Sequence, residues 1–142
     1  AYAVVSQHRW RLSAFGYVVT SVQRPNGTWT ELRLHRLVRP DIVGQIDHKN
    51  NNKRDNRSDN LRPATSSQNQ ANTGLGRNNT SGFKGVSWNR GCSKWQTHIR
   101  ANCRSINLGY FTDVKEAARA YDAAAEHYFG EFALTNRKLG LL

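Results

Sequence analysis

Short runs of alternating apolar and polar residues open the chain, over residues 9–38. The runs are interrupted at Phe15-Gly16 and at Pro25-Asn26-Gly27. Alternation is typical of a β-strand, because successive side chains face opposite sides. An Asn-Gly pair between two such runs is a strong signal for a tight hairpin turn. The pattern therefore predicts a small antiparallel β-ribbon in this region.

Residues 81–111 return to a strand-like pattern, in the segments FKGVSW, KWQTHIRA and SINLGYF. The next segment, TDVKEAARAYDAAAEHYFG, instead places apolar residues at helical spacing, at Ala117, Tyr121, Ala124 and Tyr128. Asp113 and Glu116 form a capping-box pattern at its start, and Gly130 stands where the helix should end. The pattern predicts three strands and one helix, whose alanine-rich face allows close packing on the sheet.

A polar stretch, residues 43–72, separates these two patterned regions. Its central part, IDHKNNNKRDNRSDNL, is almost all Asn, Asp, Arg and Lys, and its end, TSSQNQAN, is compatible with a helix. By composition alone the stretch suits either a solvated linker or a site where polar side chains gather. Residues 73–80, TGLGRNNT, hold Gly and Asn without periodicity and predict a linker.

The composition narrows the choice of partner. The 142 residues allow one ordinary domain or two small ones, and the net charge of +11 favours an anionic partner, above all nucleic acid. No run approaches the roughly 18 apolar residues of a membrane span, so no membrane partner is expected. The first residues lack a secretory signal pattern, which favours a cytoplasmic protein. Cys92 and Cys103 form no Cys-x-x-Cys pair, so we expect free thiols.

The order of residues in the polar stretch carries more information than its composition. The ordered positions are Asp47-His48, Asp55-Asn56-Arg57, Asn60-Leu61-Arg62, Asn69 and, upstream, His35-Arg36. From about Leu34 to Asn72 this order resembles the His-Asn-His (HNH) nucleases, and among them the phage and intron homing-endonuclease type. A disordered linker needs no particular order, so the resemblance favours a site.

The resemblance implies a β-hairpin followed by a helix, the ββα-metal (His-Me finger) arrangement, with one divalent metal ion. By the family pattern His48 is the general base, Asp47 and Asn69 hold the metal, and Asn60 fixes the loop so that His48 points correctly. The residues suit this chemistry, because an imidazole titrates near pH ~6.5 and Mg²⁺ prefers oxygen ligands. The expected products carry a 5′-phosphate and a 3′-hydroxyl.

Each of these residues also has a plainer interpretation. Alone, Asp47 is more typical of a turn and His48 of a packed histidine, but the positions together favour the catalytic interpretation. His35 is interpreted as structural, and Asp55-Asn56-Arg57 as turn architecture. Many relatives have His where this chain has Asn69, and the homing type has Asn. We interpret Asn69 as a mark of that branch, which favours Mg²⁺ or Mn²⁺ over Zn²⁺.

A second resemblance covers residues 81–136. The segments SGFKGVSWNRGCSKWQTHIRA, INLGYF and EAARAYDAAAEHYFGEFALTN resemble the APETALA/ethylene-response-factor DNA-binding domain. In that family a three-stranded sheet lies in the major groove, and Lys84 and Arg100 fall on basic contact positions. Four other contact positions carry different residues here, namely Ser87, Asn89, His98 and Asn107. The GC-rich target of the plant factors is therefore not expected.

Two sets of residues are predicted to contact DNA. The first half contributes Arg36, Lys49, Lys53, Arg54, Arg57 and Arg62. The second half contributes Lys84, Trp88, Arg90, Lys94, Arg100 and Arg104. Trp95, by contrast, is expected to be buried. Both halves are basic, with net charges of +7 over residues 1–80 and +4 over residues 81–142.

Together these features predict an α+β chain. A nuclease domain with its β-ribbon spans residues 1–72, followed by a linker (73–80), a DNA-binding domain (81–136) and a tail (137–142). We expect a DNA endonuclease that acts on double-stranded DNA with one Mg²⁺ or Mn²⁺ ion and no small-molecule cofactor. The first half would cut and the second would choose the site, in a phage protein acting in the bacterial cytoplasm. The alternative is a non-cleaving DNA-binding transcriptional regulator, against which the intact site residues argue.

Overall fold

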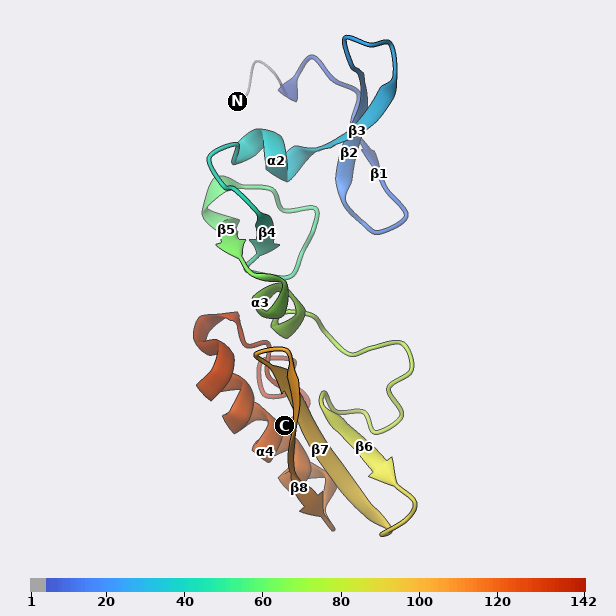
Figure 1. Ribbon diagram of the computed structural model, residues 1–142, viewed down its shortest axis with the longest axis vertical. Coiled ribbons are helices and arrows are strands. Elements are labelled where there is room, and N and C mark those ends of the chain that lie inside the picture. The colour runs from blue at the N-terminus through green and yellow to red at the C-terminus, as the bar shows by residue number, and fades with distance from the viewer. Residues whose placement is uncertain (1–4) are drawn as a thin grey trace. The chain divides into compact units, whose positions relative to one another are not determined.

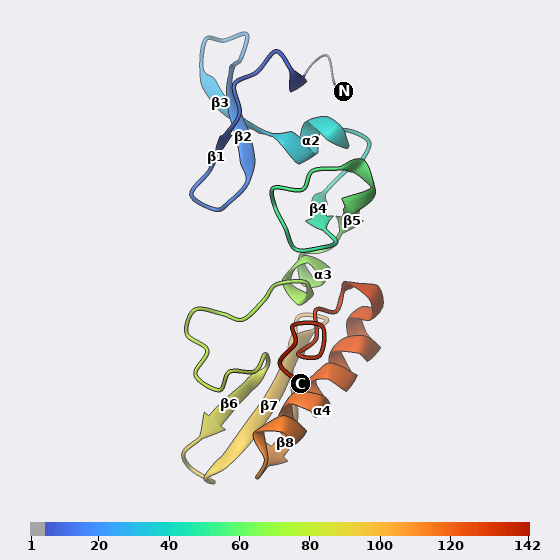
Figure 2. The same ribbon diagram turned by 180° about the vertical axis from the view of Figure 1, so that it is seen from behind.

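The computed structural model describes residues 5–142, in which several small antiparallel sheets combine with a few helices (Figures 1 and 2). The chain divides into two compact units, Ala1–Thr65 and Ser66–Leu142. This mixed composition agrees with the expected α+β class. In the part of the chain that the structure describes, no helix has the length and apolar character needed to cross a membrane.

The first unit opens with a three-stranded antiparallel ribbon, in the order β1 (Arg11–Leu12), β2 (Val18–Gln23) and β3 (Trp29–Arg33). Between β2 and β3 the Asn-Gly turn is present, with Gly27 at a φ of 80° that glycine adopts at little cost. The ribbon prediction was wrong for the last residues, because Leu34–Val38 form the helix α2. Leu34, Leu37 and Val38 recur at helical spacing, which outweighs the alternation.

The polar stretch forms a second, shorter hairpin. Its strands are β4 (Gln45–His48) and β5 (Leu61–Ala64), which pair in antiparallel fashion. A small apolar cluster of Ile42, Ile46 and Leu61, with Val38 beside it, packs these strands. The long connection between them holds a short 3₁₀ turn, Ser58–Asn60. The stretch is therefore an ordered element with a core of its own.

The second unit begins with the helix α3 (Ser66–Ala71) and ends with the C-terminal segment. Residues 72–85, which include the predicted linker, contain no helix or strand. The end of α3 is attached to the rest of this unit, because the carbonyl of Ala71 accepts a hydrogen bond from the Leu134 amide at 3.2 Å.

The main part of the second unit is a three-stranded antiparallel sheet that packs on one helix. The strands β6 (Val86–Asn89), β7 (Lys94–Ala101) and β8 (Arg104–Phe111) lie in sequence order, and α4 (Val114–Phe129) runs alongside β7 and β8 in both views (Figures 1 and 2). Asp113 caps α4 by accepting the Lys115 amide at 2.9 Å, and Gly130 ends it at a φ of 50°. The predicted strands and helix are thus confirmed.

Small residues let α4 approach the sheet closely. Ala117 and Ala118 are fully buried against Val86, and Ile99 packs with Tyr121 and Ala125 in a second cluster. Trp95 is half-buried against the first of these clusters, in agreement with its expected burial.

A buried asparagine closes the second unit. The Asn136 Oδ1 atom accepts the Lys84 amide at 2.7 Å, and its Nδ2 atom donates to the Lys84 carbonyl at 3.2 Å. Asp122 completes the arrangement, because its Oδ1 atom accepts hydrogen bonds from both nitrogens of Asn136. Residues 84 and 136 therefore lie side by side.

Candidate functional site

The hairpin of β4 and β5 places two adjacent polar side chains on opposite faces. Asp47 lies across from Arg62, and His48 lies across from Leu61. Because side chains alternate along a strand, His48 shares the face of Ile46 and the apolar cluster, whereas Asp47 lies on the other face. Both side chains are buried, with 3% of Asp47 and 5% of His48 exposed.

The imidazole of His48 is held by an asparagine from the loop. Its Nε2 atom lies 3.1 Å from the Asn56 Oδ1 atom. The Asn56 amide nitrogen donates to the carbonyls of Lys53 and Arg54, which fixes the oxygen toward the ring. Nε2 must then be the donor, so Nδ1 is the basic nitrogen of the neutral ring. Asn56, which the sequence suggested was part of a turn, contacts His48 directly.

Two further rings pack against His48. The His35 ring lies edge-on at 5.4 Å between centroids, and Tyr17 lies 6.2 Å from His48 and 5.5 Å from His35. Burial, with a smaller contribution from the charge of His48, lowers the pKa of His35 to about 4. His35 is therefore neutral at pH 7. Its structural interpretation is consistent with this packing, whereas no pattern in the sequence pointed to Tyr17.

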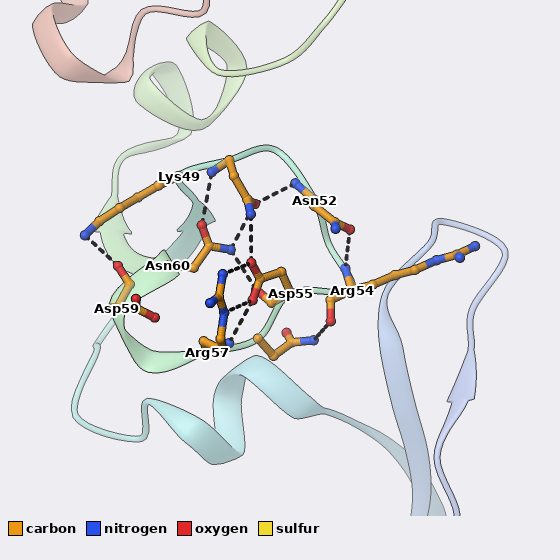
Figure 3. A network of polar contacts seen from close by, with 9 residues as sticks. Lys49, Asn52, Arg54, Asp55, Arg57, Asp59 and Asn60 are labelled. Carbon is orange, nitrogen blue, oxygen red and sulfur yellow. Dashed lines mark hydrogen bonds and ion pairs between the residues drawn. The ribbon is translucent and has the colours of Figure 1, made fainter.

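Asn60 organises the loop between the two strands (Figure 3). Its Oδ1 atom accepts the Asn50 amide at 3.1 Å, and its Nδ2 atom donates to Asn50 Oδ1 and to the Asp55 carbonyl. Lys49 adds a bond from its ammonium group to the Asp59 carbonyl at 2.7 Å. Asn60 thus bonds across the loop and not to the imidazole, so its effect on His48 is indirect.

The loop also carries an exposed ion pair. Arg57 and Asp55 meet at 2.8 Å, and this hydrogen bond holds the pKa of Asp55 well below its usual range. The Arg54 side chain, in contrast, extends away from the network (Figure 3). A loop of this polarity is therefore ordered by its own side chains, not left as a solvated linker.

Asp47 forms a buried ion pair with Arg62, at 2.9 Å between Oδ2 and Nε. This contact orients the carboxylate, which has several lone pairs and can accept more than one partner. The described residues contain no group of three or more His, Cys, Asp and Glu side chains that could hold a metal. A carboxylate supplemented by an amide oxygen and water nevertheless suits a hard cation such as Mg²⁺.

Asn69, the other predicted metal ligand, is half-buried on α3 and belongs to the second unit. Its pairing with Asp47 stays a prediction. The first unit by itself brings together His48, Asn56 and the loop that Asn60 organises, with Asp47 on the adjacent position of β4.

The predicted DNA contacts differ in accessibility. In the first unit Arg36 donates to the carbonyls of Ile42 and Gly44, Lys53 donates to the Phe15 carbonyl at 3.1 Å, and Arg54 is exposed. Arg62 is only 8% exposed and is paired with Asp47, so a phosphate contact does not fit its geometry.

Lys84 also has a structural role. Its ammonium group donates to the carbonyls of Ala71 at 2.6 Å and Leu134 at 2.9 Å. Burial lowers its pKa to about 8. This geometry does not favour the predicted DNA contact for Lys84.

The strand register separates the two faces of the second sheet. Gln96 pairs with Tyr110, His98 with Asn107 and Arg100 with Ser105, on the face away from the buried Thr97 and Ile99. This outer face is polar and carries Arg100, with Lys94 at the start of the same strand. Trp88 lies across from Trp95, 5.0 Å between ring centroids, and is therefore on the helix side of the sheet.

Comparison with known proteins is consistent with this site. Residues 40–71, which hold β4, β5 and α3, match the family model described as HNH endonuclease. An uncharacterized HNH endonuclease of Acanthamoeba polyphaga mimivirus is 30% identical over 141 residues, covering 94% of this chain and 70% of that protein. No solved structure matches the chain. The chain belongs to the HNH endonuclease family, whose members generally depend on a divalent metal ion.

Proposed function

We propose that this protein is a metal-dependent endonuclease that hydrolyses phosphodiester bonds in double-stranded DNA. The observation that carries the proposal is the buried His48 ring, held at Nε2 by Asn56 and adjacent to Asp47 on β4. A general base must be fixed in one orientation and one tautomer, and this arrangement supports both. Family membership supports the same activity at the level of the class.

His48 is the proposed general base. With Nε2–H donated to Asn56, the Nδ1 atom takes the proton from the water that attacks phosphorus. The Asn56 oxygen remains an acceptor for the imidazolium that results, so the ring keeps its orientation through the proton transfer. A positioned base of this kind accelerates a reaction by roughly 10²–10⁴-fold.

Asp47 and Asn69 are the residues that would hold the divalent ion. The ion pair with Arg62 fixes the Asp47 carboxylate in one orientation. A bound Mg²⁺ or Mn²⁺ would neutralise the charge that develops on the leaving 3′-oxygen, which gives 5′-phosphate and 3′-hydroxyl products. Asn60 supports the site from outside, by holding the loop that carries Asn56.

The outer face of the second sheet is the proposed site-choosing surface. Arg100 and Lys94 supply positive charge there, and Arg90 and Arg104 lie at the ends of the neighbouring strands. Amide and imidazole groups at Gln96, His98 and Asn107 accompany them. Basic groups contact phosphates and amides read base edges, so the face combines both kinds of contact.

Nicking of supercoiled plasmid, with Mg²⁺ or with a chelator, tests the enzyme. We expect wild-type protein to cut with Mg²⁺, and His48→Ala to lose at least about 100-fold in rate. The matched control is His127→Ala, which removes an exposed imidazole from α4 and should cut normally. Cleavage that survives His48→Ala would overturn the mechanism. DNA binding without cleavage when Mg²⁺ or Mn²⁺ is supplied would instead favour the regulator.

The same assay includes the double variant Lys94→Ala and Arg100→Ala. If the second sheet chooses the site, this variant should keep its nicking rate at low salt and lose preference among cleavage positions, mapped by sequencing the cut ends. An unchanged preference would remove this sheet from the proposal without affecting the role of His48.

A further inference from the structure

Two cations gather on one tyrosine beside the candidate base. The Arg33 guanidinium carbon lies 4.9 Å from the centroid of the Tyr17 ring, and the Lys53 ammonium lies 4.5 Å from it. The same ring lies 6.2 Å from the ring of His48. Arg33 ends β3, and Lys53 comes from the loop between β4 and β5, so two separate elements each place a charge near this ring.

Few groups inside the protein neutralise these charges. Among the described residues, Glu31 is the one carboxylate within ion-pair distance of either cation, at 3.9 Å from Arg33, and both side chains are about half-exposed. The Arg33 guanidinium donates none of the hydrogen bonds identified within residues 5–142. Lys53 uses one of its three N–H donors, on the Phe15 carbonyl at 3.1 Å. Two like charges near one ring repel each other, and an anion that reaches both would relieve that repulsion.

The identity of the anion follows from the neighbouring His48, and this step rests on the proposed function. A DNA strand carries one phosphate per about 3.4 Å of helix axis, so phosphates next to the cut bond must pass close to the base. We propose that Arg33 and Lys53 bind a backbone phosphate adjacent to the one that is cut. Tyr17 is the positioning residue that holds both cations in place by cation–π contact.

Arg33 suits this role better than a plain surface charge would. Its planar fork offers several donors and matches two phosphate oxygens at once, while the Tyr17 ring limits the orientations of the side chain. Lys53 was predicted to contact DNA from the sequence. The structure adds Arg33 and Tyr17, so in this proposal the ribbon contributes to the substrate-binding surface.

The test uses the full-length protein and a labelled DNA duplex, with a chelator present so that the DNA stays intact. Dissociation constants are measured over a range of salt concentrations. Loss of one phosphate contact makes the slope of log K against log salt shallower by about 0.9. Between 0.1 M and 1 M salt the affinity of such a variant should therefore fall about eightfold less than that of wild type. We expect this change for Arg33→Ala and retention of most of the slope for Arg33→Lys, which keeps the charge.

Two further variants test whether Arg33, Lys53 and Tyr17 act together as a phosphate clamp, or whether any loss of charge has the same effect. Tyr17→Leu removes no charge but releases both cations, so its slope should also fall, whereas Tyr17→Phe keeps the ring and should bind like wild type. The control Arg119→Ala removes the same charge from an exposed position on α4 and should change the slope far less. Melting curves of all variants identify any that fail to fold. If Arg33→Ala does, Arg33→Gln replaces it, because it removes the charge but keeps a polar side chain, and its slope should fall while that of Arg33→Lys does not.

The outcomes distinguish this inference from the proposed function. A normal slope for Arg33→Ala in a protein that cuts DNA overturns the phosphate clamp and leaves the endonuclease standing. An equal fall for Arg119→Ala and Arg33→Ala also overturns it. A reduced slope for Arg33→Ala and Tyr17→Leu in a protein that binds but never cuts DNA supports the clamp and removes the endonuclease.

Discussion

The interiors of the two units contain different kinds of side chain. Among residues 5–65 of the first unit the buried polar residues outnumber the apolar ones, and they are Thr20, His35, Asp47, His48, Asn56, Asn60 and Arg62. In the second unit the buried set is mainly apolar and rich in alanine, at Ala71, Ala101, Ala117, Ala118, Ala125 and Ala133. The first interior depends on hydrogen bonds and one ion pair, the second on close contact between helix and sheet.

This difference separates two requirements that a single small core meets poorly. A site for phosphodiester chemistry needs charged and polar groups in fixed positions, and burying them costs free energy unless each is paired. The apolar packing of α4 on its sheet has no such cost. We therefore expect the first unit to respond most to changes of charge, and the second most to changes of size.

The largest effect is expected when the buried ion pair of the first unit is broken. Arg62→Met leaves the buried Asp47 carboxylate without its guanidinium partner, which should lower the free energy of unfolding by about 3–5 kcal/mol. Urea denaturation measures the change.

The matched control is Arg57→Met, which breaks the pair with Asp55 at a position where the Arg57 side chain is 73% exposed, and it should cost far less because water screens the pair. Equal costs for the two variants would mean that burial of the pair does not matter, and that the first unit is not especially sensitive to charge.

A change of size should act most strongly on the second unit. A Cβ atom on Gly85 would stand 1.9 Å from the Cδ2 atom of Tyr121, and the φ of 76° is already unfavourable for alanine. Gly85→Ala should therefore cost about 3 kcal/mol, from overpacking together with backbone strain. The measurement is again urea denaturation.

Gly27→Ala is its counterpart in the ribbon of the first unit. Gly27 has a similar φ of 80°, but nothing lies within 4 Å of the added atom. We expect a cost of about 1 kcal/mol from strain alone. If Gly27→Ala were as costly as Gly85→Ala, strain and not packing would explain both.

Smaller effects should appear in two separate pH ranges, and in both ranges stability should rise with pH. The pKa of His35 is about 4 in the folded chain, below its ordinary value of 6.5, so the unfolded chain binds the proton more readily. The contribution of His35 is intact above pH 6.5 and is lost as the pH falls toward 4. The pKa of Lys84 is about 8, below 10.5, so the stability of the second unit should rise between pH 8 and 10.5.

Denaturation curves at pH 4.5 and 7 test the His35 range, and curves at pH 8 and 9.5 test the Lys84 range. His35→Phe should reduce the loss toward acid, and Lys84→Met should reduce the gain between pH 8 and 9.5. Tyr121 opposes that gain only above its ordinary pKa of 10, because burial raises its pKa to about 12. A wild-type chain that loses stability from pH 8 to 9.5 would show that the Lys84 ammonium is not penalised by burial.

Local sequence patterns predicted much of the fold. The Asn26-Gly27 turn, the Asp113 cap and the Gly130 end each depend on neighbours within a few residues, which a sequence displays directly. The short helix α2 was missed because five residues hold too little periodicity to separate a helix from a strand. The domain boundary near residue 72 stays a prediction.

The candidate site was predictable in its order but not in its contacts. Spacing pointed to Asp47, His48 and Asn60, whereas Asn56 was interpreted as a turn residue because its bond to His48 has no signature in the sequence. Tyr17 lies far from His48 along the chain, and only tertiary packing brings the two rings together. The same limit applies to Lys84, whose basic character says nothing of the carbonyls that bind it.

The pairing of Lys84 with the buried Asn136 has a consequence for engineering. A unit that starts and finishes at neighbouring points can be placed within a surface loop of a host protein without forcing the loop apart. It can equally be circularly permuted, with a short peptide joining residues 84 and 136 and new ends opened in a β-turn. Residues 84 and 136 are therefore neighbouring points at which a transferred segment would begin and end, and such a transfer must retain Asn136 together with Phe83, which packs in the same unit.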